Sequence, residues 1–402
     1  MAVIDERERQ RLMEQAAQVA GASTRSRTRR QDVIEAIETY LAISDPEAVD
    51  VIMATAIAIH LPGDPLWLLV VAPPGGAKTE LLRTINGSQV VTISTLTPHT
   101  LISGLKGDAE KTDLLPKLDG KLLVIKDFTS ILSKKPEDAT AIYADLREAY
   151  DGYLEKSFGS GVGTKCYHSR FGIIAAVTPA MDMYRNVHAL LGERFLRVNI
   201  RSQQESAIRR ASEVEGNEKE MRDELAGAVG AYLARAGEWV DDSIVIEQRQ
   251  LEQMRALAHV YATLRSSIIR DRRRVVLYSP EPEIGTRLVK QLMRLGKALA
   301  NWRERLLVTA EDYITVRRVA LDGIPKNRLA CLKALLAADG WIGTQKVGDV
   351  ATQATDTARE TLEDLWLLGV IDRFGKQYQW RVTDATRSLL AKACVDLEAG
   401  NC

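Results

Sequence analysis

The sequence predicts an α/β fold, in which a parallel sheet covered by helices on both faces precedes a helical segment and a small helix-and-ribbon domain. Five short apolar segments alternate with amphipathic ones, as is typical of strands buried on both faces; they are residues 66–71, 89–93, 122–125, 172–177 and 195–200. Residues 202–322 carry apolar side chains at helical spacing. After Ile324-Pro325, three helical segments precede an apolar–polar ribbon at 370–382, which is the plan of a winged helix.

These segments predict four parts: an N-terminal helical and basic extension (1–40), an α/β core (41–201), an all-α lid (202–322) and a winged-helix domain (325–402). The 402 residues are 46% hydrophobic, which is enough for several packed cores. The formal net charge is zero, so any contact with nucleic acid depends on local basic patches.

The lack of a recognisable targeting or membrane-spanning segment and the cysteine usage lead us to expect a cytoplasmic protein. No apolar run approaches the ~18 residues that a membrane-spanning helix needs. The N-terminus is charged and lacks the apolar segment of a signal peptide. Four scattered cysteines show neither metal-ligand spacing nor a disulfide framework, so we expect a reducing cytosol.

The most informative segment is WLLVVAPPGGAKTELL at 67–82, an apolar strand that leads into a glycine turn and a helix start. This is the layout of a phosphate-binding loop, although Ala72 and Ala77 occupy the glycine positions of the usual pattern. Lys78 is expected to reach the β- and γ-phosphates of ATP, and the Thr79 hydroxyl to hold Mg²⁺. The predicted nucleotide contacts are Pro74, Gly75, Gly76, Ala77, Lys78, Thr79 and Glu80.

Four further residues follow the loop in the order expected of an ATPase. Asp127 ends the strand KLLVIKDF and is a candidate Mg²⁺ ligand or base for the attacking water. Thr178, after the next strand, is a candidate for holding that water or the γ-phosphate. Arg194 precedes the last strand as a candidate arginine finger, and Arg287 begins a long helix from which it could contact phosphate.

Taken together, these motifs resemble an AAA+ ATPase, and in detail the minichromosome-maintenance (MCM) helicase branch, over about residues 45–395. The matching positions are Ala77-Lys78, Ile125-Lys126-Asp127-Phe128, Ala176-Val177-Thr178-Pro179, Leu190–Phe195 and Thr286-Arg287-Leu288. The resemblance implies ATP and Mg²⁺ as cofactors, a homo-oligomeric and typically hexameric ring, and DNA in its channel. Barely 40 residues precede the core, so we expect a compact relative from a phage or mobile element that lacks the MCM N-terminal domain.

One departure from that pattern bears on hydrolysis. Lys126 stands where the resemblance implies a metal-associated Asp, and Asp127 where it implies a Glu. Two unit charges of like sign ~4 Å apart repel by about 4 kcal/mol at an effective dielectric near 20. Lys126 therefore either turns away from Mg²⁺ or contacts phosphate itself, and we expect hydrolysis to be slow.

Candidate DNA contacts lie in two places. Alternating residues around the glycines at 159–163 predict a β-hairpin at about 153–168, and the resemblance implies that it carries a basic residue to DNA; Lys165 is the best match and Lys156 the second. A surface hairpin with solvated lysines is the alternative. In the winged helix, the candidates on the recognition helix and wing are Arg359, Arg373 and Lys376.

Three functions fit these observations. The leading one is an ATP-dependent DNA motor, most simply an MCM-like replicative helicase. The second is an initiator or helicase loader that uses ATP mainly to assemble, which Lys126 favours. The third is a regulatory or defence scaffold whose winged helix binds protein. The basic run at 270–274 fits a DNA contact, a subunit contact or an exposed loop.

Overall fold

The computed structural model describes residues 30–41, 43, 45–75, 78–159, 162–183, 194–201, 203–271, 273–278, 281–338, 340–375 and 378–397. The contacts form two compact units: Met1–Glu247 with Arg294–Thr315, and Gln248–Met293 with Val316–Cys402. Helices α13 (Thr286–Trp302) and α14 (Ala310–Asp322) contribute to both units. Within the described ranges, no helix is long and apolar enough to cross a membrane.

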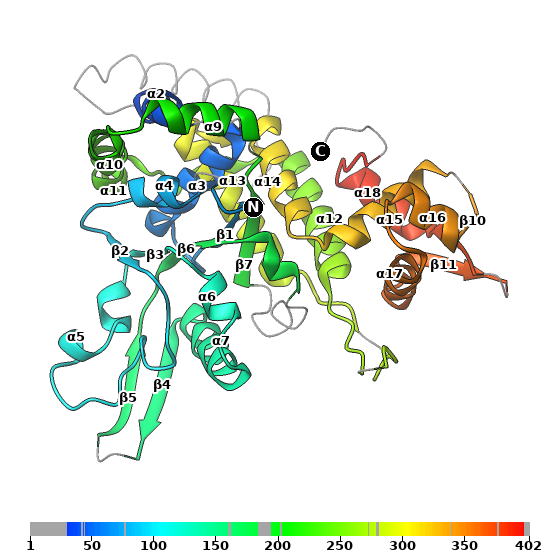
Figure 1. Cartoon of the computed structure of the whole chain (residues 1–402), viewed down its shortest axis with the longest axis horizontal. Helices are drawn as coiled ribbons and strands as arrows, with labels where there is room; N and C mark the ends of the chain where they lie inside the picture. The colour runs from blue at the N-terminus through cyan, green and yellow to red at the C-terminus, as the bar shows by residue number, and fades with distance from the viewer. Residues whose placement is uncertain are drawn as a thin grey trace. The chain divides into compact units, whose positions relative to one another are not determined.

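The first unit is built on a five-stranded sheet in the order β2-β3-β6-β1-β7, and every neighbouring pair is parallel (Figure 1). The predicted α/β fold and its strands are confirmed, since each bound lies within one residue of the expected one. Because β1 lies between β6 and β7 and β3 lies beside β6, the carboxyl ends of β1, β3 and β6 meet at one edge. The strands are β1 (Trp67–Val71), β2 (Val90–Ile93), β3 (Leu122–Ile125), β6 (Gly172–Val177) and β7 (Phe195–Asn199).

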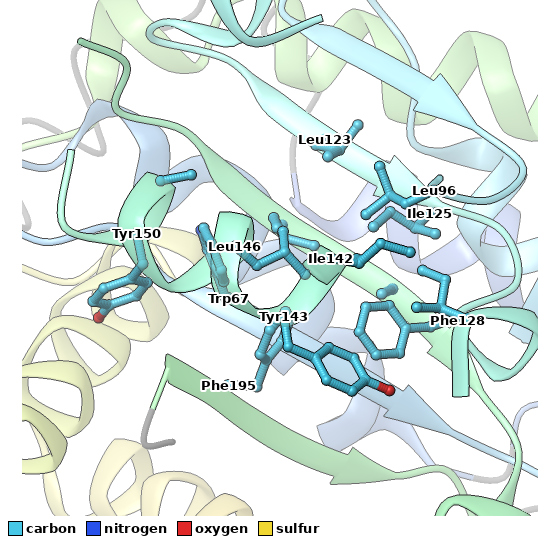
Figure 2. Packing of buried hydrophobic residues seen from close by; sticks show 14 of the residues in the cluster. Trp67, Leu96, Leu123, Ile125, Phe128, Ile142, Tyr143, Leu146, Tyr150 and Phe195 are labelled. Carbon is cyan, nitrogen blue, oxygen red and sulfur yellow. The ribbon is translucent and has the colours of Figure 1, made fainter. Parts of the chain in front are cut away.

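Helices cover both faces of this sheet. On one face, α3 (Pro46–Ile57) contacts β1, β6 and β7 and α4 (Lys78–Thr84) contacts β6. On the other, α7 (Pro136–Tyr150) packs its apolar side chains against alternate residues of β1 and β3 in one buried cluster (Figure 2). Trp67 lies in that cluster, fully buried, and its indole donates a hydrogen bond to the Phe171 carbonyl at 2.8 Å.

A buried charge network attaches the end of α13 to α3. The Arg303 guanidinium donates to Asp50 and to Asp312, each at 2.8 Å. The Trp302 indole donates to Asp50 at 2.6 Å. All three charged side chains are at least nine-tenths buried, so the segment after residue 294 is held to the sheet-bearing unit by charge and burial together.

The remaining elements of the first unit are short or peripheral. The predicted hairpin is present, with β4 (Tyr153–Phe158) and β5 (Gly163–His168) paired antiparallel. The others are α2 (Arg30–Tyr40), η1 (Ala58–His60), α5 (Ala109–Thr112), η2 (Leu115–Leu118), α6 (Thr129–Leu132), η3 (Pro179–Met183), α9 (Gln204–Glu213), α10 (Glu218–Ala234), α11 (Ala236–Trp239), β8 (Val245–Ile246) and β9 (Leu307–Val308).

The second unit combines helices with a small antiparallel sheet. Its three-stranded antiparallel sheet has the order β10-β12-β11, and α12 packs against α18. The bounds of these and the remaining elements of the unit are α12 (Gln248–Arg265), α15 (Lys326–Ala337), β10 (Ile342–Gly343), α16 (Thr344–Val350), α17 (Thr355–Leu367), β11 (Ile371–Phe374), β12 (Gln379–Val382) and α18 (Asp384–Lys392).

The contacts divide the helical segment differently from the predicted lid. Helix α10 packs against α2 and α4 and belongs with the parallel sheet of the first unit, whereas α12 packs against α18 and belongs to the second unit. The short parallel pair β8–β9 also interrupts the predicted all-α segment. Helical periodicity marks helices but does not say which core each one joins.

Candidate nucleotide-binding site

The predicted phosphate-binding loop lies at the carboxyl end of β1. The Ala72 amide donates to the Val177 carbonyl at 3.3 Å, which continues the β1–β6 pairing into the loop. Pro74 and Gly75 form an exposed turn, and Gly75 has a φ of 78°, a conformation that favours glycine. Helix α4 begins at Lys78. Gly76 and Ala77 lie outside the described residues.

Lys78 is held at the start of α4 beside an acidic group. Its ammonium donates to the Pro73 carbonyl at 3.2 Å. Burial lowers the pKa of Lys78, and the negative charge of Asp127 opposes that shift. Lys78 and Asp127 therefore lie within electrostatic reach of each other, as a shared phosphate site requires.

The next two loop residues differ in what they can offer. Thr79 is half-buried in the first turn of α4. The Glu80 carboxylate accepts hydrogen bonds from Arg83 at 2.6 Å and from Arg222 at 2.8 Å. Burial opposes the charge of Glu80, but Arg222 and Arg83 outweigh it and lower its pKa. The carboxylate thus fixes α4 against α10, and only the backbone of Glu80 suits a nucleotide contact.

Asp127 follows β3 at the same edge as the loop. Its side chain is exposed, its amide donates to the Ser94 carbonyl at 3.2 Å, and its carboxylate accepts from the Ser130 amide at 3.3 Å. The Lys126 amide donates to the Ile93 carbonyl at 3.0 Å, so β3 continues alongside the end of β2 beyond its last regular residue. The Asp127 carboxylate is open to solvent, where a hydrated cation has access.

Thr178 lies at this edge as well, immediately after β6 and between the ends of β1 and β3. Its amide donates to the Thr129 hydroxyl at 3.0 Å, and the two hydroxyl oxygens are 3.4 Å apart. Thr129 was missed from the sequence. The only available signal was a hydroxyl residue two positions after Asp127, which would not have stood out without the neighbouring strand.

Arg194 lies at the amino end of the parallel strands, opposite the carboxyl end that bears the loop. It precedes β7, whose first residue Phe195 pairs with Trp67 at the start of β1. The length of β1 at roughly 3.3 Å per residue puts about 16 Å between Arg194 and the loop. The guanidinium is 11% exposed and donates to Asp151 at 2.8 Å, with the Tyr150 ring centroid 5.7 Å away. Arg194 cannot reach the loop of its own chain.

Helix α13 carries two arginines, Arg287 and Arg294, which differ in their unit and their contacts. Arg287 lies in the first turn of α13 and belongs to the second unit. Arg294, in the first unit, donates to the carbonyls of Leu61 and Pro62, in the loop before β1. Burial, reinforced by the nearby Arg170 charge, lowers the pKa of Arg294 to about 10.

The hairpin lysines are engaged inside the chain, contrary to the sequence-based expectation that they reach outward. The Lys165 ammonium forms an ion pair with the fully buried Asp113 at 3.0 Å and donates to the Ser103 carbonyl at 2.9 Å. Lys156 pairs with Asp145 at 2.6 Å. Lys165 is only 13% exposed, so as folded it anchors the hairpin and would have to leave Asp113 to bind DNA.

In the second unit, three acidic residues of α17 form ion pairs with arginines of the 270–274 run. Arg270 reaches Asp364 at 2.7 Å and Glu363 at 3.5 Å, and Arg274 reaches Glu360 at 3.4 Å. The first and last arginines of the 270–274 run therefore hold α17, a role not among those expected. The acids that would repel phosphate are neutralised.

The predicted DNA contacts of this unit are distributed over helix and ribbon. Arg359 is exposed on α17 and lies 4.0 Å from Asp356. The Arg373 guanidinium carbon lies 3.9 Å from the Trp366 ring centroid, so the guanidinium stacks on that ring while the residue remains exposed. Lys376 lies outside the described residues.

Oxygen ligands for a cation are few at this site. Within the described ranges, no three His, Cys, Asp or Glu side chains gather as a metal site would. Thr79 and Asp127 nevertheless fit Mg²⁺ of the kind that arrives with a nucleotide, because that ion commonly takes one or two protein oxygens and completes its shell with phosphates and water.

Among known proteins, the chain has matches in solved structures. No family model matches the chain, and no curated protein matches it. A solved structure of a protein from Cytophaga hutchinsonii, proposed to be an ATPase, has a TM-score of 0.45 and 16% identity and covers 73% of this chain and 85% of its own. The chain's own geometry is the firmer observation: a parallel α/β sheet with Lys78, Asp127 and Thr178 at its loop-bearing edge.

Proposed function

We propose that this protein is an ATPase that binds ATP with Mg²⁺ at the carboxyl edge of β1, β3 and β6. The observation that carries the proposal is that Lys78 and Asp127 follow β1 and β3 at the same, carboxyl end of the parallel sheet, with Lys78 at a helix start after a glycine turn. The α4 start and Lys78 would bind the phosphates, and Thr79 and Asp127 would hold Mg²⁺. Mg²⁺ supplies charge neutralisation of the transferred phosphoryl group.

The hydroxyl pair completes the chemistry at this edge. The backbone amide of Thr178 donates a hydrogen bond to the Thr129 hydroxyl, which brings the two residues together. Hydroxyl groups so placed can orient a water molecule for in-line attack on the γ-phosphate, while Asp127 accepts its proton.

The position of Arg194 supports a homo-oligomer. An arginine that stabilises the transition state must reach the phosphates, and Arg194 lies at the far edge of its own sheet. A second copy would supply it, and a closed head-to-tail arrangement of this kind is a ring, which we propose to be hexameric.

We further propose that ATP hydrolysis drives movement along DNA, as in an MCM-like replicative helicase of a phage or mobile element. The hairpin β4–β5 and the winged-helix arrangement support this reading. An initiator or loader with weak hydrolysis is the alternative, favoured by Lys126 in place of an acid. A regulatory or defence scaffold is the third.

Two variants test the ATPase and its shared site. Lys78→Ala should abolish binding of a fluorescent ATP analogue, whereas Arg194→Ala should bind it and release no phosphate. Mixing these two inactive variants should restore part of the activity, because an interface can form from their intact halves. Arg209→Ala, which removes an exposed arginine on α9, is the matched control and should behave as wild type. Normal hydrolysis by Arg194→Ala would refute the shared site.

Coupling to DNA is tested separately. Strand displacement distinguishes a helicase from a loader, and phosphate release with and without DNA distinguishes both from a protein-binding scaffold. A rate that DNA leaves unchanged, together with no displacement, would exclude the motor.

A further inference from the structure

Exposed aromatic side chains gather around the ribbon of the second unit. Trp341, Trp366, Phe374 and Tyr378 are 41%, 37%, 66% and 40% exposed. Large aromatic side chains are ordinarily buried, and a cluster of exposed ones is typical of a binding site. We call this group, together with Arg373 and Arg381, the wing platform.

One half of the wing platform is a ladder of stacked groups. The Arg373 guanidinium carbon lies 3.9 Å from the Trp366 ring centroid and 5.2 Å from that of Tyr378. Tyr378 in turn stacks on Trp380, with centroids 6.0 Å apart and planes inclined by 18°. Trp380 is fully buried, and its indole donates to the Thr344 hydroxyl at 2.9 Å. The ladder is therefore anchored in the core of the unit and its outer members are preorganised.

The other half lies on the opposite side of the ribbon. Arg373 pairs in register with Trp380 and Phe374 with Gln379, so neighbouring side chains alternate between the two sides. Phe374 lies 5.6 Å from Trp341, centroid to centroid, and the Arg381 guanidinium lies 5.0 Å from the Trp341 ring. Arg381 is also 3.4 Å from Asp372.

This composition fits single-stranded nucleic acid better than a protein ligand. Every base has a flat face that can stack on an aromatic ring, and guanidinium groups beside the rings attract the phosphates that join the bases. Arg373 and Arg381 outnumber Asp372, the carboxylate that Arg381 contacts, so these residues together carry a net positive charge. The nearby acids of α17 do not oppose it, because Arg270 and Arg274 neutralise them.

We propose that the wing platform binds single-stranded DNA by stacking bases on Phe374 and Trp341, with Arg381 beside the phosphates. This inference rests on the proposed function in taking DNA as the partner. It differs from groove reading by α17, because stacked bases must be unpaired.

Anisotropy of a labelled thymidine oligonucleotide of roughly 15 nucleotides, titrated with the full-length protein without nucleotide, tests the proposal. Phe374→Ala and Trp341→Ala should each weaken binding roughly 5- to 150-fold, as the loss of one stacked base predicts. Tyr278→Ala removes another exposed aromatic of the same unit, 56% exposed and outside the platform, and should leave affinity unchanged. Because Phe374 is largely exposed, its variant should melt at the wild-type temperature.

The salt dependence separates stacking from charge. Arg381→Gln should reduce the slope of log K against log salt by about 0.7, whereas Phe374→Ala should lower affinity and leave the slope unchanged. Unchanged affinity in both aromatic variants, or tighter binding of the matching duplex than of the single strand, would overturn the inference and leave a protein partner as the occupant.

The two proposals fail in different ways. Loss of the wing inference leaves ATP binding intact, since none of the platform residues lies in the first unit. Absence of ATP binding by the wild-type protein would refute the proposed ATPase and leave the oligonucleotide result standing.

Discussion

Removing the carboxylate of Asp113 should release the hairpin β4–β5 from the rest of its unit. Asp113 is fully buried and accepts hydrogen bonds from three groups: the Lys165 ammonium at 3.0 Å, the Tyr167 hydroxyl at 2.7 Å and the Ser103 amide at 2.8 Å. Lys165 and Tyr167 belong to β5, whereas Ser103, like Asp113, belongs to the segment that connects β2 to β3. One side chain thus joins the two segments.

The structure sets the size of the effect. The Lys165 side chain is 13% exposed in the folded protein and loses its counter-ion in Asp113→Ala, and loss of one partner of a buried pair costs about 3–5 kcal/mol. Exchange of the β5 amides through local opening should therefore accelerate by roughly 100- to 3,000-fold. Glu213→Ala breaks an exposed pair with Arg209 at 3.8 Å and should cost about 1 kcal/mol or less.

Hydrogen exchange followed by mass spectrometry measures this opening directly. A double variant sharpens the test: adding Lys165→Met to Asp113→Ala removes the unpaired charge, so the pair of changes should cost less than their sum by about 1–3 kcal/mol. Strict additivity, or β5 exchange within tenfold of wild type in Asp113→Ala, would refute the claim that this ion pair holds the hairpin.

The pH dependence of the same contact has a definite sign. Burial opposes the charge of Asp113, but the Tyr167 hydroxyl, the Ser103 amide and Lys165 outweigh it and lower its pKa below the ordinary 3.8. A lowered carboxyl pKa stabilises the folded state fully above the ordinary value and loses that contribution as pH falls through the lowered one. Hairpin protection should therefore persist to about pH 4 and decline only in stronger acid. Tyr167, whose pKa burial and Asp113 raise to about 12, remains a donor throughout.

The remaining predictions concern the acidic strand end and a glycine before β1. Asp127→Asn should retain ATP and release no phosphate, while Lys126→Asp should keep or raise the rate, because a carboxylate near Mg²⁺ favours phosphoryl transfer; loss of turnover in Lys126→Asp would show that the lysine itself contacts phosphate. Gly63 has a φ of 91°, and an added Cβ would clash with the Arg294 guanidinium. Gly63→Ala should therefore lower thermal stability more than Gly87→Ala, which has a φ of 136° and open space around its Cβ; equal melting temperatures would contradict this.

Local patterns in the sequence determined the strands, the loop and the hairpin. The runs at 122–125 and 172–177 are buried at every position, as continuous apolar segments require in a sheet covered on both faces. The glycine turn before Lys78 and the glycines between β4 and β5 mark sharp reversals for which few other residues are suited. Such features depend on neighbours in the chain, so the sequence contains them directly.

The partners of the charged side chains were decided only by the tertiary structure. Lys165 meets Asp113 from 52 positions away, and Glu80 meets Arg222 from 142. In the sequence these residues are indistinguishable from solvated lysines and glutamates, because charge and spacing do not reveal burial. A buried charge must find a counter-ion or hydrogen bonds, and which group supplies them depends on how segments far apart in the chain are packed together.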